Sequence, residues 1–170
     1  MDKPITTALF IVISIVLAVM LFNVAYPAVQ KGGDAINNMA SRAEDRMKTQ
    51  IAVIHAAAEI DSSGWWQDTN GNGDVDVFVW VKNVGDTRIT ALDHMDVFFG
   101  AEGNFTRIPY RSAATGSYPY WSGQIEGGSD WNPTTTLKIT IHYNATLAAG
   151  RYYAKVTLPS GNSDQYFLSI

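Results

Sequence analysis

The chain has 170 residues, a formal net charge of -4 and no cysteine. This length allows one ordinary domain with an appendage, and the missing cysteines exclude disulfide bonds and thiol chemistry. Residues 61–170 carry the whole net negative charge, and the sequence has no clustered basic stretch. We therefore expect no nucleic-acid partner, since such a partner needs a concentrated basic face.

The first predicted element is an uncharged apolar segment near the start of the chain, Ile5–Tyr26. As a helix, this segment is long enough to cross a hydrocarbon core about 30 Å thick. Asp2 and Pro4 suit the first turn of a helix, because a negative charge and a missing N–H are both tolerated there. A secretory signal peptide has a shorter apolar stretch, a basic front and a small-residue cleavage site. We expect the segment to be retained.

A helical pattern continues beyond the apolar segment, although Pro27, Gly32 and Gly33 weaken it. Apolar residues recur every three or four positions and form one stripe of an amphipathic helix. The stripe consists of Ile36, Met39, Ala43, Met47, Ile51, Ile54 and Ala57. The sequence therefore predicts one long helix over residues 4–60, which makes residues 1–60 the first domain.

From Trp65 onward the hydrophobic pattern changes to a period of two. The stretch "DVDVFVWVKNVG" at 74–85 alternates strictly between valine and larger or polar residues, which is typical of a β-strand. Six further strands are expected at residues 94–100, 105–110, 118–122, 135–143, 151–158 and 165–170. About seven short strands separated by turns predict an antiparallel immunoglobulin-like β-sandwich head over residues 61–170. The predicted fold class is α+β, with a long N-terminal helix before this head.

The stretch "DTNGNGDVD" is the most specific local motif for a metal ion. Oxygen-bearing side chains at alternate positions, followed by glycine, resemble the start of a calcium-binding loop. The candidate ligands are Asp68, Asn70, Asn72, Asp74 and Asp76. Val79 stands where an EF-hand needs a glutamate, so this is not an EF-hand. The alternative is an Asn/Gly-rich turn that enters a strand. We expect that the protein requires no cofactor, and Ca²⁺ is the ion that this motif favours.

Two triplets match the Asn-x-Thr pattern for N-glycosylation, at Asn104 and Asn144. Catalysis has little support in the sequence. His55, His94 and His142 lie in three different predicted elements, and the sequence contains no phosphate loop, nucleophile elbow or HExxH motif. We therefore expect that the protein is not an enzyme.

Two stretches resemble archaellins, the type IV pilin-like subunits of the archaeal swimming filament. "ITTALFIVISIVLAVMLFNVAYPAV" at 5–29 is similar to the filament-core helix, and "DVDVFVWVKNVGDTRI" at 74–89 is similar to a strand and turn of the head domain. "LDHMDVFF" at 92–99 resembles the strand that follows. Many bacterial pilins have a glutamate where this chain has Ile5, which argues against a conventional bacterial pilin.

The resemblance implies a structural subunit of an extracellular helical filament for swimming, inserted in the membrane as a precursor. Its partners are then copies of itself, the membrane before assembly, and the assembly platform and motor proteins. The helix residues expected to pack in the filament core are Ile5, Leu9, Phe10, Val12, Ile13, Val16, Leu17, Met20, Leu21 and Val24.

Three alternatives to this function stay open from the sequence. The first is an adhesion filament of the type IV pilus kind. The second is a membrane-anchored archaellum accessory or stator-like protein whose head binds the surface layer or another partner. The third is a membrane-tethered hydrolase or carbohydrate-binding protein. Only the many aromatic residues and the calcium-like loop support this third alternative.

Overall fold

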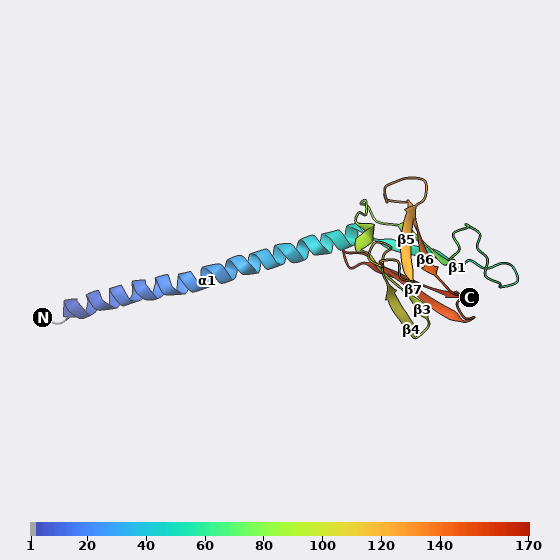
Figure 1. Cartoon of the computed structure of the whole chain (residues 1–170). Helices are drawn as coiled ribbons and strands as arrows, with labels where there is room; N and C mark the ends of the chain where they lie inside the picture. Colours follow the sequence, from blue (N-terminus) through green and yellow to red (C-terminus); the bar gives the residue numbers. More distant parts are fainter. Residues whose placement is uncertain (1–2) are drawn as a thin grey trace. The chain divides into compact units, whose positions relative to one another are not determined.

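A computed structural model describes residues 3–170 of the chain (Figure 1). It divides into two compact units, residues 1–43 and 44–170. Over the described range it contains one α-helix, α1 (Lys3–Lys48), a short 3-10 helix, η1 (Leu92–His94), and eight strands. The strands are β1 (Ile51–Ala58), β2 (Val75–Asn83), β3 (Asp96–Ala101), β4 (Asn104–Ile108), β5 (Tyr120–Ile125), β6 (Thr136–Tyr143), β7 (Arg151–Thr157) and β8 (Ser163–Ser169).

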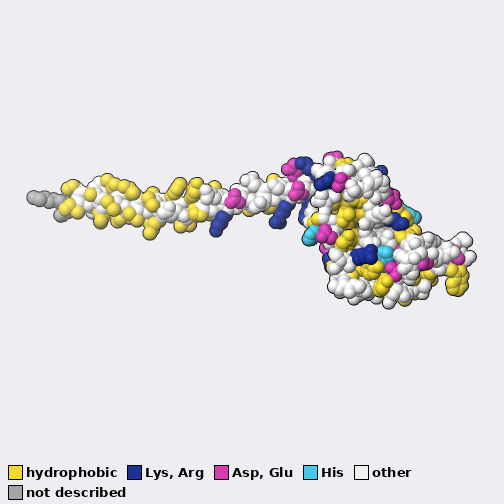
Figure 2. Space-filling view, turned by 45° about the horizontal axis from the view of Figure 1, so that its top comes forward, with side chains coloured by type: hydrophobic (Ala, Val, Ile, Leu, Met, Phe, Trp, Pro, Cys, Tyr) yellow, Lys and Arg dark blue, Asp and Glu magenta, His cyan; other side chains and the backbone are white. Residues whose placement is uncertain are grey.

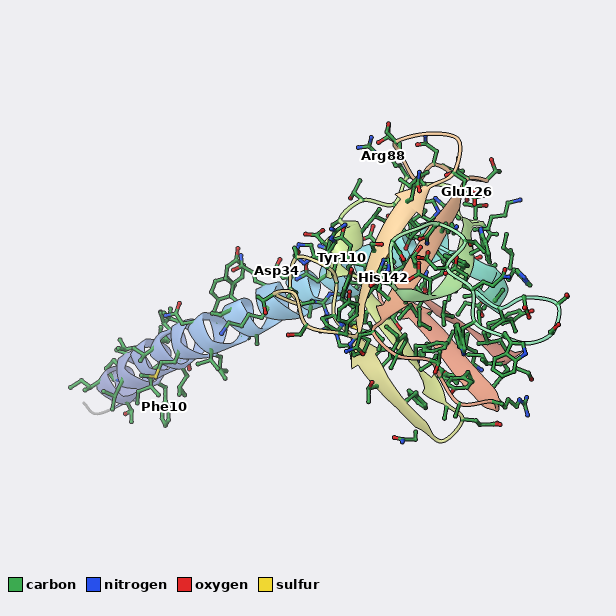
Figure 3. All side chains as sticks on the ribbon, turned by 45° about the vertical axis from the view of Figure 1, so that its right-hand side comes forward. Phe10, Asp34, Arg88, Tyr110, Glu126 and His142 are labelled. Carbon is green, nitrogen blue, oxygen red and sulfur yellow. The ribbon has the colours of Figure 1, made fainter. Side chains whose placement is uncertain are left out.

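The N-terminal part of α1 exposes apolar side chains, and Figure 2 shows them over the visible face of the helix. Helix α1 passes through Pro27 without interruption. The ten residues predicted to pack in a filament core, from Ile5 to Val24, are each between 45% and 75% exposed within the chain. Phe10 is an example, projecting away from the helix axis in Figure 3. These side chains are available to lipid or to another protein, and their role in assembly stays a prediction.

The prediction that the helix continues to residue 60 is wrong. Helix α1 ends at Lys48, and Ile51–Ala58 forms β1, which pairs antiparallel with β2. A register shift between Val53 and His55 brings Val53 and Ala56 to the buried side of this strand. The stripe predicted here ran through Ile51, Ile54 and Ala57, but Ile54 is exposed, and the β-bulge buries Val53 and Ala56 instead. The segment becomes a strand because it pairs with β2, and a local sequence pattern does not reveal that pairing.

The head is a sandwich of two four-stranded antiparallel sheets, with strand orders β1-β2-β6-β5 and β4-β3-β7-β8. The prediction of an α+β chain with an immunoglobulin-like head is confirmed, and β1 is the eighth strand that the sequence did not reveal. Alternate residues of the central strands fill the core, because successive side chains of a strand point to opposite faces. The fully buried residues include Val77, Val79 and Val81 from β2 and Ile139 and Ile141 from β6.

The last turn of α1 belongs to the second unit and is held by two turns of the head. Asp86 N donates to Lys48 O at 2.9 Å, and Asn162 Nδ2 donates to Arg46 O at 2.5 Å. These bonds satisfy carbonyl groups that lack a partner at the C-terminal end of a helix. A Cβ on Gly85 would lie 2.2 Å from Lys48 O, so glycine is required for this close approach. The turn of the "VKNVGD" stretch thus has a structural role.

Candidate functional site

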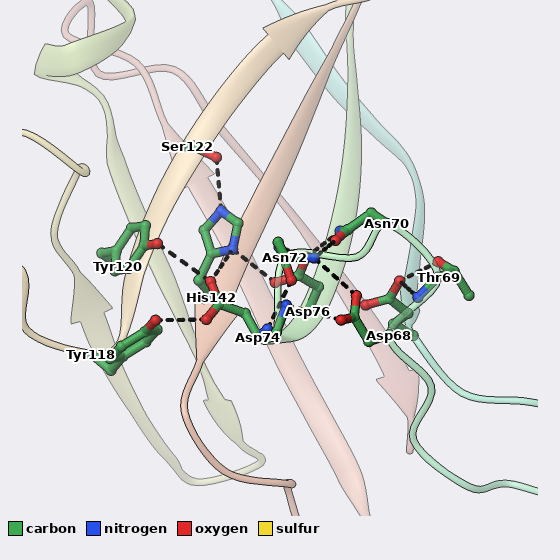
Figure 4. A network of polar contacts seen from close by, with 12 residues as sticks. Asp68, Thr69, Asn70, Asn72, Asp74, Asp76, Tyr118, Tyr120, Ser122 and His142 are labelled. Carbon is green, nitrogen blue, oxygen red and sulfur yellow. Dashed lines mark hydrogen bonds and ion pairs between the residues drawn. The ribbon is translucent and has the colours of Figure 1, made fainter.

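A cluster of ionisable side chains lies where β2, β6 and β5 run side by side (Figure 4). Asp76 of β2 is opposite His142 of β6, and His142 is opposite Tyr120 of β5. Asp76 points away from the core residue Val77, because neighbouring residues of a strand face opposite ways. It is nevertheless fully buried, since the loop before β2 covers it. This outer face of the sheet therefore contains a buried carboxylate beside an imidazole.

His142 lies between two carboxylates and a hydroxyl group. Its Nδ1 atom is 2.8 Å from Asp76 Oδ1 and 3.3 Å from Asp74 Oδ2. Its Nε2 atom is 2.9 Å from Ser122 Oγ, and its ring stacks on Tyr120 with the ring centres 4.7 Å apart. Nδ1 and Asp76 Oδ1 contact each other without hydrogen-bond alignment, and neither has a hydrogen-bond partner among the described residues.

The remaining oxygen atoms of the two aspartates accept hydrogen bonds from outer residues. Asn70 Nδ2 and Asn72 Nδ2 donate to Asp76 Oδ2 at 2.7 and 2.9 Å. Tyr118 OH donates to Asp74 Oδ1 at 2.6 Å, and this bond to a carboxylate raises the pKa of Tyr118 to about 12. Each acidic side chain is thereby fixed in orientation. On the opposite, core-facing side of β6, burial raises the pKa of Tyr143 to about 12.

The structure divides the five predicted calcium ligands into two groups. Asp74 and Asp76 lie together with His142, with one ligand atom of each within 4.8 Å of the others. The Asp68 carboxylate instead accepts backbone N–H bonds from Gly71 and Gly73 at 2.7 and 2.9 Å.

The side-chain oxygens of Asn70 and Asn72 also receive backbone N–H groups of the loop, those of Asn72 and Asp74 at 3.0 and 2.8 Å. These are the Asx-type bonds that shape turns. The oxygen atoms of this loop are therefore engaged in maintaining its own backbone, and calcium binding stays a prediction.

Other members of the cluster were not singled out from the sequence. His142 was treated as isolated, and Ser122 and Tyr120 were expected as parts of the strand at 118–122. Glu59, which is 4% exposed, accepts a hydrogen bond from Thr69 N at 2.7 Å and anchors the start of the loop. These residues come together only because β2 pairs with β6 and β6 pairs with β5. A local sequence pattern does not reveal such long-range pairing.

The two predicted glycosylation residues and the two remaining histidines lie apart from this cluster. Asn104 begins β4 and Asn144 follows β6, and both are exposed, so glycosylation at either is a prediction that the structure leaves accessible. His94 is exposed in η1, 3.9 Å from Asp93. His55 lies on β1, where it stacks on Trp80.

No protein-family model matches this sequence. An uncharacterised protein of Archaeoglobus fulgidus is 24% identical over 144 residues, which are 82% of this chain and 79% of that protein. Two solved structures from Sulfolobus acidocaldarius are similar to the chain. The archaellum periplasmic stator protein FlaG has 26% identity and a TM-score of 0.53, covering 71% of this chain and 99% of that one. A chain of the stator protein complex of FlaF and FlaG has 27% identity and a TM-score of 0.52, covering 72% and 90%.

These neighbours bear on the predicted function. Both are stator proteins of the archaellum rather than filament subunits, so the resemblance to archaellum proteins is confirmed and the finer assignment to the archaellins is not. The predicted homopolymer and its location as an extracellular filament likewise receive no support. The alternative of a membrane-anchored accessory protein fits the neighbours better.

Proposed function

We propose that this protein is a membrane-anchored, non-enzymatic accessory protein of the archaellum with a stator-like role. The observation that carries the proposal is the similarity to FlaG, which extends over 99% of that stator chain at 26% identity. Helix α1 spans the cell membrane in this proposal, and the sandwich head lies outside the cell. The head makes the contacts through which the protein acts.

The exposed apolar side chains of α1 support the membrane anchor. The described chain has one helix, Pro4–Lys48, that is long and apolar enough to cross a membrane, and its apolar window is not buried within the chain. Placing one large apolar side chain out of water is worth roughly 1.5–3 kcal/mol. The ten predicted core residues between Ile5 and Val24 are 45–75% exposed, so together they amount to roughly 9–18 kcal/mol, as much as the net stability of an ordinary domain. This segment therefore requires an apolar environment, and a bilayer supplies one.

The solved complex indicates what kind of partner the head has. FlaF and FlaG of S. acidocaldarius form a stator protein complex. By analogy, we propose that the head of this protein binds a second archaellum accessory protein. In this proposal, the head of this protein and the head of its partner meet outside the cell. Their contact holds the stator in place beside the rotating filament.

Deleting the gene for this protein in its host tests the proposal. A stator-like protein predicts that the deletion strain still assembles surface filaments but swims poorly, and that an epitope-tagged copy restores swimming and fractionates with membranes. Sheared, purified filaments should contain it only in trace amounts. A strain that swims normally without the protein, or filaments in which it is the main component, would overturn the proposal.

A further inference from the structure

We propose that Asp74, Asp76 and His142 form a binding site for one divalent transition-metal ion, with Zn²⁺ as its representative. The ion would lie on the outer face of the β1-β2-β6-β5 sheet and join the loop before β2 to strands β2 and β6. This inference is independent of the archaellum role, because it rests on the geometry of the head alone.

One heteroatom of each residue remains for a metal, and the other is already held. Asp76 Oδ2 accepts from Asn70 and Asn72, Asp74 Oδ1 accepts from Tyr118, and His142 Nε2 contacts Ser122 Oγ. The atoms that remain are Asp74 Oδ2, Asp76 Oδ1 and His142 Nδ1, and Nδ1 lies 3.3 Å from the first and 2.8 Å from the second. Asp74 Oδ2 also accepts a long hydrogen bond from Tyr120 OH at 3.4 Å, which a metal ion would replace. Metal ligands typically have outer partners that orient them in this way.

Asp76 gives the second, independent observation. Its side chain is fully buried, and Oδ1, which faces the centre of the cluster, has no hydrogen-bond partner among the described residues. Burying a charged oxygen without such a partner is costly. Two carboxylates bring two negative charges, and a protonated imidazole balances only one of them. A divalent ion with a neutral imidazole balances both and satisfies Oδ1 and Nδ1 together.

The distances require only a small adjustment to accept an ion. Zinc binds oxygen and imidazole nitrogen at about 2.0–2.2 Å, so tetrahedral ligand atoms lie roughly 3.3–3.5 Å apart. In the structure, Nδ1 is 2.8 Å from Asp76 Oδ1 and 3.3 Å from Asp74 Oδ2. The second of these distances already fits, and the first must widen by about 0.5–0.7 Å. The Asp74 side chain is 13% exposed, so water reaches the site and can complete the coordination.

The ligand set selects the kind of ion. One imidazole nitrogen with two carboxylate oxygens suits Zn²⁺ and its neighbours in the first transition series. Calcium prefers six to eight oxygen ligands. The loop oxygens that would supply the rest are those of Asp68, Asn70 and Asn72, and they accept backbone N–H groups instead. We therefore place a transition metal, rather than calcium, at the part of the motif that faces His142.

The experiment uses the full chain in detergent after treatment with a chelator. Adding Zn²⁺ to about a hundred times its dissociation constant should raise the melting temperature of the head by roughly 8–14 °C. Isothermal titration should give one ion per chain, and bound Co²⁺ should give the intense visible absorption of four-coordinate cobalt. Ca²⁺ at the same concentration should leave the melting temperature unchanged.

Three variants complete the test. His142→Gln and Asp74→Asn should each lose the Zn²⁺-induced shift and the Co²⁺ absorption, and Asp74 is partly exposed, so its variant tests the site even if His142→Gln fails to fold. The control is His94→Gln, an exposed histidine that also lies near an aspartate, and it should behave like the unchanged protein. An unchanged melting temperature with Zn²⁺, a shift that persists in Asp74→Asn, or a shift with Ca²⁺ alone would each overturn the proposal.

Discussion

Asn83, in the "VKN" stretch at the end of β2, offers the sharpest test of how the head is held together. Its side chain is fully buried and makes three hydrogen bonds to the backbone. Nδ2 donates to Thr87 O at 2.9 Å and to Trp131 O at 3.0 Å, and Oδ1 accepts from Gly85 N at 3.0 Å. One side chain thus joins its own turn to the segment before β6. We predict that Asn83→Ala destabilises the head strongly.

The size of the effect follows from what each lost bond leaves behind. A hydrogen bond contributes about 1 kcal/mol on average, and a buried group left without a partner costs about 1–3 kcal/mol. Trp131 O also accepts from Ile89 N, and Gly85 N also donates to Gln50 O. Of these three backbone groups, Thr87 O alone is left without a hydrogen-bond partner among the described residues, so we expect a total loss of about 2–4 kcal/mol. For a head of this size, that corresponds to roughly 6–20 °C in melting temperature.

The assay is thermal unfolding of the full chain in detergent, followed by tryptophan fluorescence. The matched control is Asn104→Ala, which makes the same chemical change at an exposed position on β4 and should shift stability by less than about 0.5 kcal/mol. Amide exchange should also speed up at Gly85 and Asp86, whose N–H groups donate to Gln50 and Lys48. Equal melting temperatures for the two variants would refute the reasoning, because the buried bonds would then contribute nothing.

Two further predictions concern the turn after Asn83 and the anchor. Gly85→Ala should lower the free energy of unfolding by about 3 kcal/mol or more, because the new Cβ would lie 2.2 Å from the backbone oxygen of Lys48. The control Gly128→Ala, whose Cβ would meet nothing within 4 Å, should be tolerated. Equal melting temperatures for the two variants would contradict this prediction. Val16→Lys should weaken membrane insertion by about 2.5–3.5 kcal/mol and release more chain into alkaline carbonate washes, whereas Ile36→Lys, beyond the apolar segment, should not. Equal extraction of the two lysine variants would count against a membrane-spanning role for residues around Val16.

Most of the fold was predictable because its signals are local. The strict alternation of β2 follows directly from one face of a sheet being buried, and Val77, Val79 and Val81 are fully buried as that pattern requires. The exception was β1, where Ile51, Ile54 and Ala57 stand at helical spacing although the bulge after Val53 turns other apolar residues into the core. Local spacing alone does not distinguish these cases, since only pairing with β2 makes the segment a strand.

The candidate site was only half predictable for a related reason. Asp74 and Asp76 lie in one short motif, so the sequence revealed them, whereas His142 comes from another strand. Bringing Asp76 opposite His142 requires the register in which Val77 pairs with Ile141. A slip of one residue would turn every side chain of the strand to the other face, so core packing sets that register. The partner of the two aspartates is thus determined by tertiary structure.

The part of α1 that follows the apolar segment bears on the choice between an anchor and a filament core. Residues 5–29 are about 37 Å long as a helix, which is enough for a hydrocarbon core about 30 Å thick. The next stretch, residues 30–43, contains two glycines and three charged residues, and its large apolar residues Ile36 and Met39 are 67% and 71% exposed. A helix buried among its copies needs apolar side chains all round. In this chain they end after about one bilayer thickness, which supports the single-pass anchor proposed above.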